Sequence, residues 1–88
     1  MTAHLLIFGS VQGVGYRQFV KQNAQKFGLT GWVKNLPDNS VEAVLQGNTE
    51  AIEKMIAVCR KGPFLSEVED LQVKWIEARE IHKEFSIR

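Results

Sequence analysis

The chain has 88 residues, enough for one small hydrophobic core, so we expect residues 1–88 to form a single domain. Hydrophobic residues make up 44% of the chain and charged residues 24%, the balance of an ordinary soluble globular protein. A net charge of +1 excludes the strongly basic composition by which proteins bind nucleic acid or anionic lipid.

The first predicted element is a strand over residues 3–9, because His4-Leu5-Leu6-Ile7-Phe8 is an apolar run with little alternation. It leads into the glycine-rich segment Gly9-Ser10-Val11-Gln12-Gly13-Val14-Gly15-Tyr16-Arg17, which opens a helix over residues 16–27. Glycines can turn successive N–H groups toward one point, and the first turn of a helix leaves its N–H donors unpaired. Arg17 adds a planar guanidinium that matches two phosphate oxygens. The segment therefore predicts a cradle for one phosphate-sized dianion.

This glycine-rich segment has competing interpretations. Glycine turns often merely connect two elements, so composition alone does not separate a binding loop from a connection. A Walker A loop is excluded because no Gly-Lys-Ser/Thr follows. Glycines at positions 9, 13 and 15 also do not form the G-x-G-x-x-G motif of a dinucleotide site.

The middle of the chain predicts a hairpin. Residues 29–36 contain the strand formers Trp32 and Val33, and Pro37-Asp38-Asn39 is typical of a turn. In residues 41–46 alternation is predicted, with Val41, Ala43 and Leu45 pointing one way and Glu42, Val44 and Gln46 the other.

The second half predicts a helix and two strands. Asn48 or Thr49 can cap a helix that Gly62-Pro63 ends. A strand over residues 68–76, a polar loop over 77–83 and a short last strand with Phe85 and Ile87 follow.

This order, β-α-β-β-α-β plus a short C-terminal strand, predicts an α+β protein with a ferredoxin-like split βαβ sandwich. Two helices should cover one face of a mostly antiparallel sheet, with the first and third strands in the middle. The second strand then lies beside the third. Residues at its end can therefore approach the loop that leaves the first strand, if the two segments share an end of the sheet.

A second motif, Gly31-Trp32-Val33-Lys34-Asn35-Leu36-Pro37-Asp38-Asn39-Ser40-Val41-Glu42, lies on the predicted hairpin. Together with the glycine-rich segment it closely resembles the acylphosphatase family, and the likeness covers essentially the whole chain. Three features depart from the family pattern. Ser10 and Leu36 replace a basic residue and a small hydroxyl residue, and the turn at residues 38–40 lacks its usual glycine.

The resemblance implies hydrolysis of a carboxyl–phosphate bond, with a small acyl phosphate as substrate and inorganic phosphate as product. It implies that Arg17 binds the phosphoryl oxygens and that Asn35 orients the attacking water. Main-chain amides complete the substrate site at Gln12, Gly13, Val14, Gly15, Tyr16 and Arg17. No metal and no other cofactor is implied. Positioning and charge neutralisation suffice for phosphoryl transfer to water when the leaving group is good, and an amide can hold water without acting as a strong base.

Other phosphatase chemistries lack their residues. A cysteine phosphatase needs arginine six positions after its cysteine, but Leu65 stands six positions after Cys59. The chain has no D-x-D pair and no H-E-x-x-H motif. His4 fits a strand position without a catalytic role, and we expect His82 to be solvated in the polar loop.

One cysteine excludes an intrachain disulfide, and we expect neither a signal peptide nor a membrane-spanning segment. We expect a cytoplasmic monomer that binds neither nucleic acid nor membrane. Three alternatives stay open: a single-stranded nucleic-acid binder, a regulatory domain that binds a ligand without chemistry, and a module of a larger maturation enzyme. The first requires aromatic side chains on the central strands, and residues 41–46 have none. The length of the chain favours a free-standing protein over a module.

Overall fold

The computed structural model describes all residues from Met1 to Arg88. It contains five strands and two helices. In chain order these are β1 (Thr2–Ser10), α1 (Tyr16–Lys26), β2 (Thr30–Asn35), β3 (Val41–Gln46), α2 (Thr49–Lys61), β4 (Glu67–Ile76) and β5 (Phe85–Ile87). The predicted order of elements is confirmed, with ends that differ by at most one residue.

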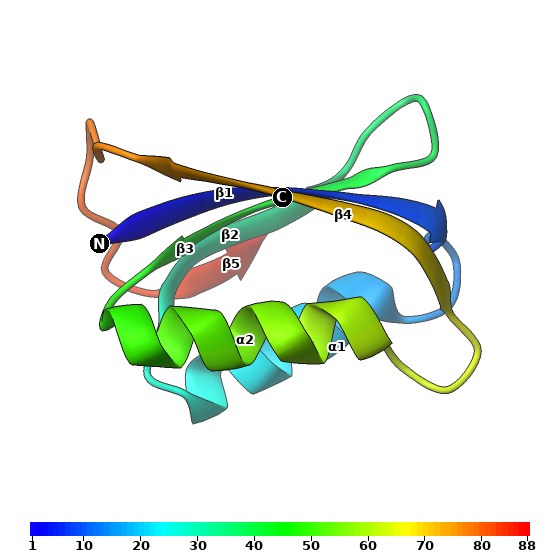
Figure 1. Cartoon of the computed structure of the whole chain (residues 1–88), viewed down its shortest axis with the longest axis horizontal. Coiled ribbons are helices and arrows are strands. Elements are labelled where there is room, and N and C mark those ends of the chain that lie inside the picture. Colours follow the sequence, from blue (N-terminus) through cyan, green and yellow to red (C-terminus); the bar gives the residue numbers. More distant parts are fainter.

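The strands form one sheet in the order β4-β1-β3-β2-β5, and both helices lie on the same face of it (Figure 1). Every neighbouring pair is antiparallel except β2 and β5, which are parallel. The predicted ferredoxin-like sandwich is therefore confirmed, and β5 makes the sheet mixed. Neither helix is both long and apolar enough to cross a membrane.

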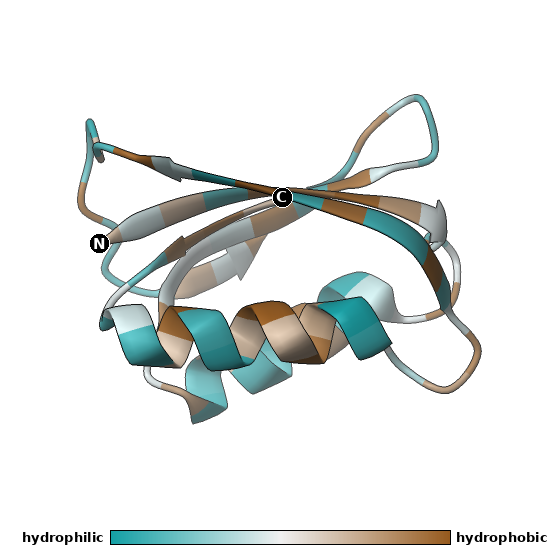
Figure 2. Ribbon diagram, viewed as in Figure 1, coloured by the Kyte–Doolittle hydropathy of each residue, from teal (hydrophilic) through white to brown (hydrophobic).

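The hydrophobic core lies between the sheet and the helices. Alternate residues of each central strand point into it, among them Leu5 on β1 and Ala43 on β3, both fully buried. Each helix contributes an apolar stripe, with Val20 and Ala24 on α1 and Met55 on α2. The apolar side of α2 faces the sheet and its charged side faces solvent (Figure 2). Burial of this stripe, more than local helix propensity, stabilises helices of this length.

The direction of the strands decides where a functional site can form. Because β1 and β2 are both antiparallel to β3, they run in the same direction and end at the same edge of the sheet. Val41 of β3 pairs with Ile7 on one side and with Asn35 on the other. Asn35 is thus level with Ile7, the last residue of β1 that pairs with β3, and the loop that leaves β1 begins after Ser10. The β2–β3 turn and the loop that enters α1 lie at the same end of the molecule (Figure 1).

One expectation about a side chain is wrong. His82 lies in the loop between β4 and β5, but its side chain is only 12% exposed. The cause is a contact distant in sequence: the His82 N–H donates to Oε1 of Gln46 at 2.8 Å, while Nε2 of Gln46 donates to the Glu80 carbonyl at 2.8 Å. The loop is therefore folded back onto the end of β3. The other histidine, His4, forms a hydrogen bond between its Nε2 and Oε2 of Glu42 at 2.7 Å. It does not line the cavity described below.

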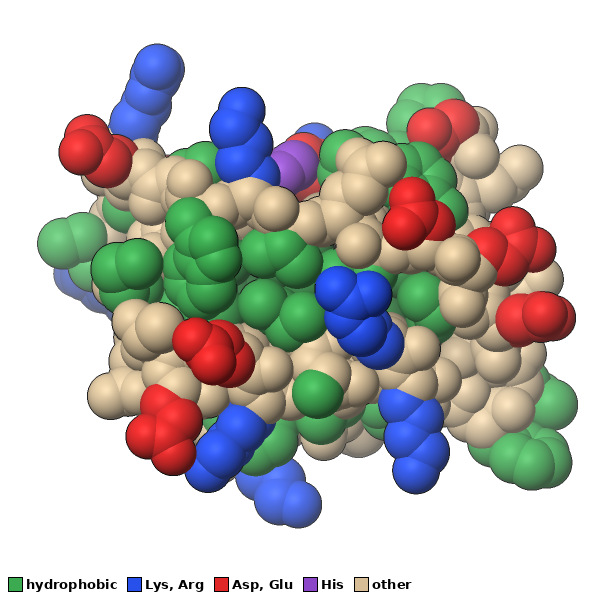
Figure 3. Space-filling view, viewed as in Figure 1, with side chains coloured by type: hydrophobic (Ala, Val, Ile, Leu, Met, Phe, Trp, Pro, Cys, Tyr) green, Lys and Arg blue, Asp and Glu red, His purple; other side chains and the backbone are tan.

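The face of the molecule shown in Figure 3 carries both acidic and basic side chains, with several acidic ones together on its right-hand side. Since the net charge is only +1 and both signs are present, the face as a whole does not carry charge of one sign. An apolar band lies between the acidic and basic groups in the same view.

Candidate active site

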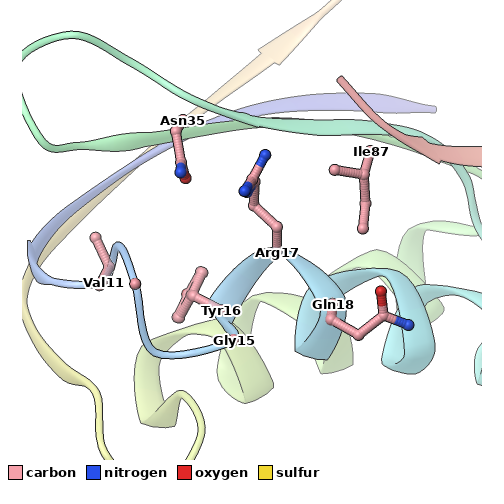
Figure 4. Close-up of a pocket in the computed structure, with 8 residues that line it drawn as sticks. Val11, Gly15, Tyr16, Arg17, Gln18, Asn35 and Ile87 are labelled. Atoms are coloured by element: carbon pink, nitrogen blue, oxygen red, sulfur yellow. The ribbon is translucent and has the colours of Figure 1, made fainter.

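A cavity of about 210 Å³ opens where the loop after β1 meets the end of β2. Its walls come from the loop, the first turn of α1, the end of β2 and the C-terminal strand β5 (Figure 4). The lining residues are Val11, Gly13, Gly15, Tyr16, Arg17, Gln18, Asn35 and Ile87. None of them carries a carboxylate, imidazole or thiol. The lining therefore has no negative charge that would repel an anion, and it lacks the carboxylate, imidazole and thiolate ligands that commonly bind metal ions.

The loop between β1 and α1 is shaped by two glycines in the left-handed region, Gly13 with φ 74° and Gly15 with φ 76°. A side chain is disfavoured at such angles, which glycine adopts readily. The carbonyl of Gly15 accepts a hydrogen bond from the Phe19 N–H at 3.0 Å, which joins the loop to the first turn of α1. The main-chain N–H groups of residues 12–18 donate to no main-chain carbonyl. The loop therefore keeps a set of main-chain donors without internal partners.

The first turn of α1 adds to this set. No side chain caps the helix, and its first turn contains no acidic residue. The free N–H groups and the helix dipole together give the start of α1 a partial positive charge. This end of the helix borders the cavity through Gly15, Tyr16 and Arg17. The local structure is therefore suited to hold an anion.

Tyr16 anchors the start of α1 and its phenol is not part of the cavity chemistry. The residue is 1% exposed, and its hydroxyl donates to the Cys59 carbonyl on α2 at 2.7 Å. Burial raises the pKa of Tyr16 far above its ordinary value, and the neighbouring Cys59 acts in the same direction. Burial likewise raises the pKa of the Cys59 thiol to about 12. Both groups are thus neutral and structural.

The guanidinium of Arg17 lies in the cavity without a carboxylate partner. It extends from the first turn of α1 toward the sheet, into the space between Asn35 and Ile87 (Figure 4). None of the four ion pairs of the chain includes Arg17. A full positive charge is therefore available to a ligand at the mouth of the loop.

Asn35 faces Arg17 from the last position of β2 (Figure 4). It lies on the same face as the fully buried Val33, two residues earlier, and so points toward the helix layer. Its Oδ1 atom is buried and accepts no hydrogen bond from the protein. A buried amide oxygen without a partner is costly in a folded protein, unless water or a ligand satisfies it.

The structure brings most of the predicted site residues together. Gly13, Gly15, Tyr16, Arg17 and Asn35 all border the cavity. Gln12 and Val14 belong to the same loop but do not line the cavity.

Three lining residues were not predicted, namely Val11, Gln18 and Ile87. Ile87 arrives through the parallel pairing of β5 with β2, in which it lies opposite Val33. The alternation of Phe85 and Ile87 indicated a strand, but only its place beside β2 puts Ile87 in the cavity. Gln18 follows Arg17 in the first turn of α1. The predicted start of the helix at residue 16 could have indicated that Gln18 lies near the loop.

The β2–β3 turn, which lacks the expected glycine, uses Asn39 in its place. Asn39 has φ 73°, and asparagine tolerates the left-handed region better than most residues. Asp38 accepts hydrogen bonds from the hydroxyl and the N–H of Ser40, which lower the pKa of the Asp38 carboxyl. The turn that follows Asn35 is thus ordered by its own side chains.

The family model and the most similar relatives name the same family. The family model described as acylphosphatase matches residues 3–87. A relative named acylphosphatase from Thermococcus kodakarensis is 49% identical over 75 residues, which cover 85% of this chain and 82% of the relative. The crystal structure of acylphosphatase from Bacillus subtilis superposes with a TM-score of 0.95 at 37% identity, covering 99% of this chain and 97% of that one.

The same fold also occurs within longer chains. The crystal structure of T. kodakarensis HypF matches with a TM-score of 0.90 at 34% identity, covering all of this chain but 12% of that one. By the family model and by relatives that match over most of their own length, the chain belongs to the acylphosphatase family.

Proposed function

We propose that the protein hydrolyses the carboxyl–phosphate bond of small acyl phosphates and releases a carboxylate and inorganic phosphate. The family and its fold support this reaction. One observation carries the assignment of residues. An unpaired guanidinium and an unpartnered amide oxygen border one small cavity beside an uncapped helix start.

In this proposal the phosphoryl group lies against the main-chain N–H groups of residues 12–17, and Arg17 binds two of its oxygens. The loop donors and the helix dipole neutralise charge on the equatorial oxygens, which is the main requirement of phosphoryl transfer. Because these donors are already free in the folded protein, little reorganisation is needed when the substrate binds.

Asn35 holds the attacking water in this proposal. The water donates a hydrogen bond to Oδ1, which satisfies the buried oxygen and leaves a lone pair of the water free to face phosphorus. The water oxygen forms a bond to phosphorus while the bond from phosphorus to the acyl oxygen breaks. The leaving carboxylate keeps the electron pair of that bond.

The proton of the water passes to an oxygen of the phosphoryl group, which leaves as dihydrogen phosphate. The amide of Asn35 is not a base, and the cavity lining contains no side chain that titrates as one near neutral pH. Substrate oxygens are thus the proton acceptors within reach. Because a carboxylate is a good leaving group, no acid is needed to protonate it.

Turnover of benzoyl phosphate at neutral pH, with a chelator present, tests this proposal. We expect hydrolysis that a chelator does not inhibit and that inorganic phosphate inhibits competitively. Calorimetric binding of phosphate without hydrolysis would instead favour a regulatory domain. Loss of turnover with the chelator, restored by a divalent ion, would refute the metal-independent reaction.

A further inference from the structure

The side chain of Gln12 leaves the loop that contains it and reaches the β2–β3 turn. Its Nε2 donates to the Leu36 carbonyl at 2.9 Å and to the Ser40 carbonyl at 2.8 Å. Both N–H groups of the amide are therefore used, and both bonds join segments that are 24 and 28 residues apart in sequence. The main chain of Gln12 belongs to the loop, while its side chain serves the turn.

The two accepting carbonyls are the ones that close the turn. The Leu36 N–H donates to the Ser40 carbonyl at 2.9 Å, and the Asn39 N–H donates to the Leu36 carbonyl at 3.2 Å. Leu36 directly follows Asn35, so the amide of Gln12 is bound one peptide unit beyond the residue that faces Arg17. A displacement of this turn would move Asn35 with it.

The end of β2 has support on one side only. On one side it pairs with β3 up to Asn35 and Val41. On the other side β5 pairs with β2 at Gly31, Trp32 and Val33, and the Arg88 N–H reaches no further than the Val33 carbonyl. The residues beyond Val33 therefore have no strand beside them on that side. The amide of Gln12 holds the turn that follows Asn35 from the loop after β1.

We propose that Gln12 is a positioning residue, which sets the distance between the water held by Asn35 and the phosphoryl group held by the loop. This inference rests on the proposed function of those two groups. Gln12 contacts neither the substrate nor the water through its side chain. Its loss leaves the loop donors and Arg17 in place, so phosphate still binds, while the water is no longer aligned with phosphorus. Misplacement by about 1 Å can lower a rate by roughly 10²-fold.

The test compares Gln12→Met with Gln22→Met. Methionine keeps the length of the side chain but removes both donors, and Gln22 is an exposed glutamine on α1. For Gln12→Met we expect kcat with benzoyl phosphate to fall by about tenfold or more, with the inhibition constant for phosphate within about threefold of wild type. Gln22→Met should match wild type in both. An unchanged kcat in Gln12→Met, or a parallel loss of phosphate binding, would overturn the inference.

Gln12→Glu gives a readout that a purely structural role would not move. Near pH 7 its carboxylate faces two carbonyl oxygens and donates to neither, whereas the protonated acid can donate to one. The ratio of kcat in Gln12→Glu to kcat in wild type should therefore rise several-fold as the pH falls from about 7 toward about 4.5, the region where a glutamate titrates. A flat ratio would contradict the inference, and this variant also serves if Gln12→Met does not fold. Absence of hydrolysis by the wild-type protein would refute the proposed function itself.

Discussion

The two helices of this protein begin in opposite ways. Helix α2 is capped by Asn48, whose Oδ1 accepts from the N–H groups of Glu50 at 2.8 Å and Ala51 at 3.4 Å. Its first turn also carries the acidic Glu50, which suits the positive end of the helix dipole. Helix α1 has Gly15 at the same position with φ 76°, no capping side chain and no acidic residue in its first turn.

The comparison shows where the structure forgoes stability for function. In α2 the side chain of Asn48 satisfies the N–H groups of Glu50 and Ala51, as capping residues commonly do. In α1 they stay open and border the cavity, and Arg17 adds positive charge to an end that already carries partial positive charge. An unfavourable charge at a helix end costs on the order of 0.3–1 kcal/mol, and a bound dianion would reverse its sign.

The largest effect is expected for Arg17→Ala, which removes the only full charge from the cavity lining. We expect kcat/KM with benzoyl phosphate to fall by at least about 10³, as for other arginines that bind a transferring phosphoryl group. Phosphate should raise the melting temperature of the wild type but not that of Arg17→Ala, because a ligand stabilises a folded protein only if it binds it. Arg17→Lys is the matched control, and it should recover part of the activity by restoring charge without the planar fork. Near wild-type turnover in Arg17→Ala would contradict the assignment.

Asn35→Ala should separate catalysis from binding at the same cavity. We expect kcat to fall by roughly 10²–10³, the effect of losing one fixed group that acts in the transition state. The inhibition constant for phosphate should stay near its wild-type value, because the loop and Arg17 are untouched. Asn23→Ala on α1 is a matched control away from the cavity. An Asn35→Ala protein that turns over at the wild-type rate would rule out the proposed role.

Gly15→Asp would make the start of α1 resemble that of α2 by placing a carboxylate beside the free N–H groups. A Cβ atom at Gly15 meets nothing within 4 Å, and aspartate tolerates the left-handed region. We expect the inhibition constant for phosphate to rise by about tenfold or more through repulsion between like charges. Gly15→Asn, which adds the same volume without charge, should have a smaller effect. Equal inhibition constants for the two variants would show that the charge of this helix end does not matter.

The smallest effect on activity is expected at the other helix. Asn48→Ala removes the cap of α2 and should lower the free energy of unfolding by about 1 kcal/mol, or roughly 4–8 °C in melting temperature for a domain of this size. Its kcat and KM should match those of the wild type, because Asn48 lies outside the cavity. Thermal unfolding followed by circular dichroism measures the first quantity. A loss of activity without a loss of stability would break the contrast between the two helices.

Local patterns in the sequence predicted most of the fold. Period-two alternation in residues 41–46, helical spacing in residues 16–27 and the cap at Asn48 each depend on neighbours a few positions away. The elements exist as predicted for that reason. The central places of β1 and β3, with β2 beside β3, followed from the order of elements, since right-handed crossovers and a hairpin leave few arrangements.

Long-range contacts could not be predicted in the same way. The burial of His82 depends on Gln46, 36 residues away, and the place of Ile87 depends on which strand accepts β5. Gln12 was predicted only as part of the binding loop, and its two bonds to the β2–β3 turn gave no local signal. Such contacts depend on how packed elements approach one another, which is a property of the whole structure.

By itself the sequence determined a strand, a loop of free N–H donors and a helix that carries Arg17, because backbone angles and helix ends are set by adjacent residues. Only the tertiary structure decided that Asn35 stands level with that loop, with its oxygen buried and unpartnered. The physical reason is that β1 and β2 share no pairing of their own. Ile7 and Asn35 are level because each pairs with Val41 of the strand between them.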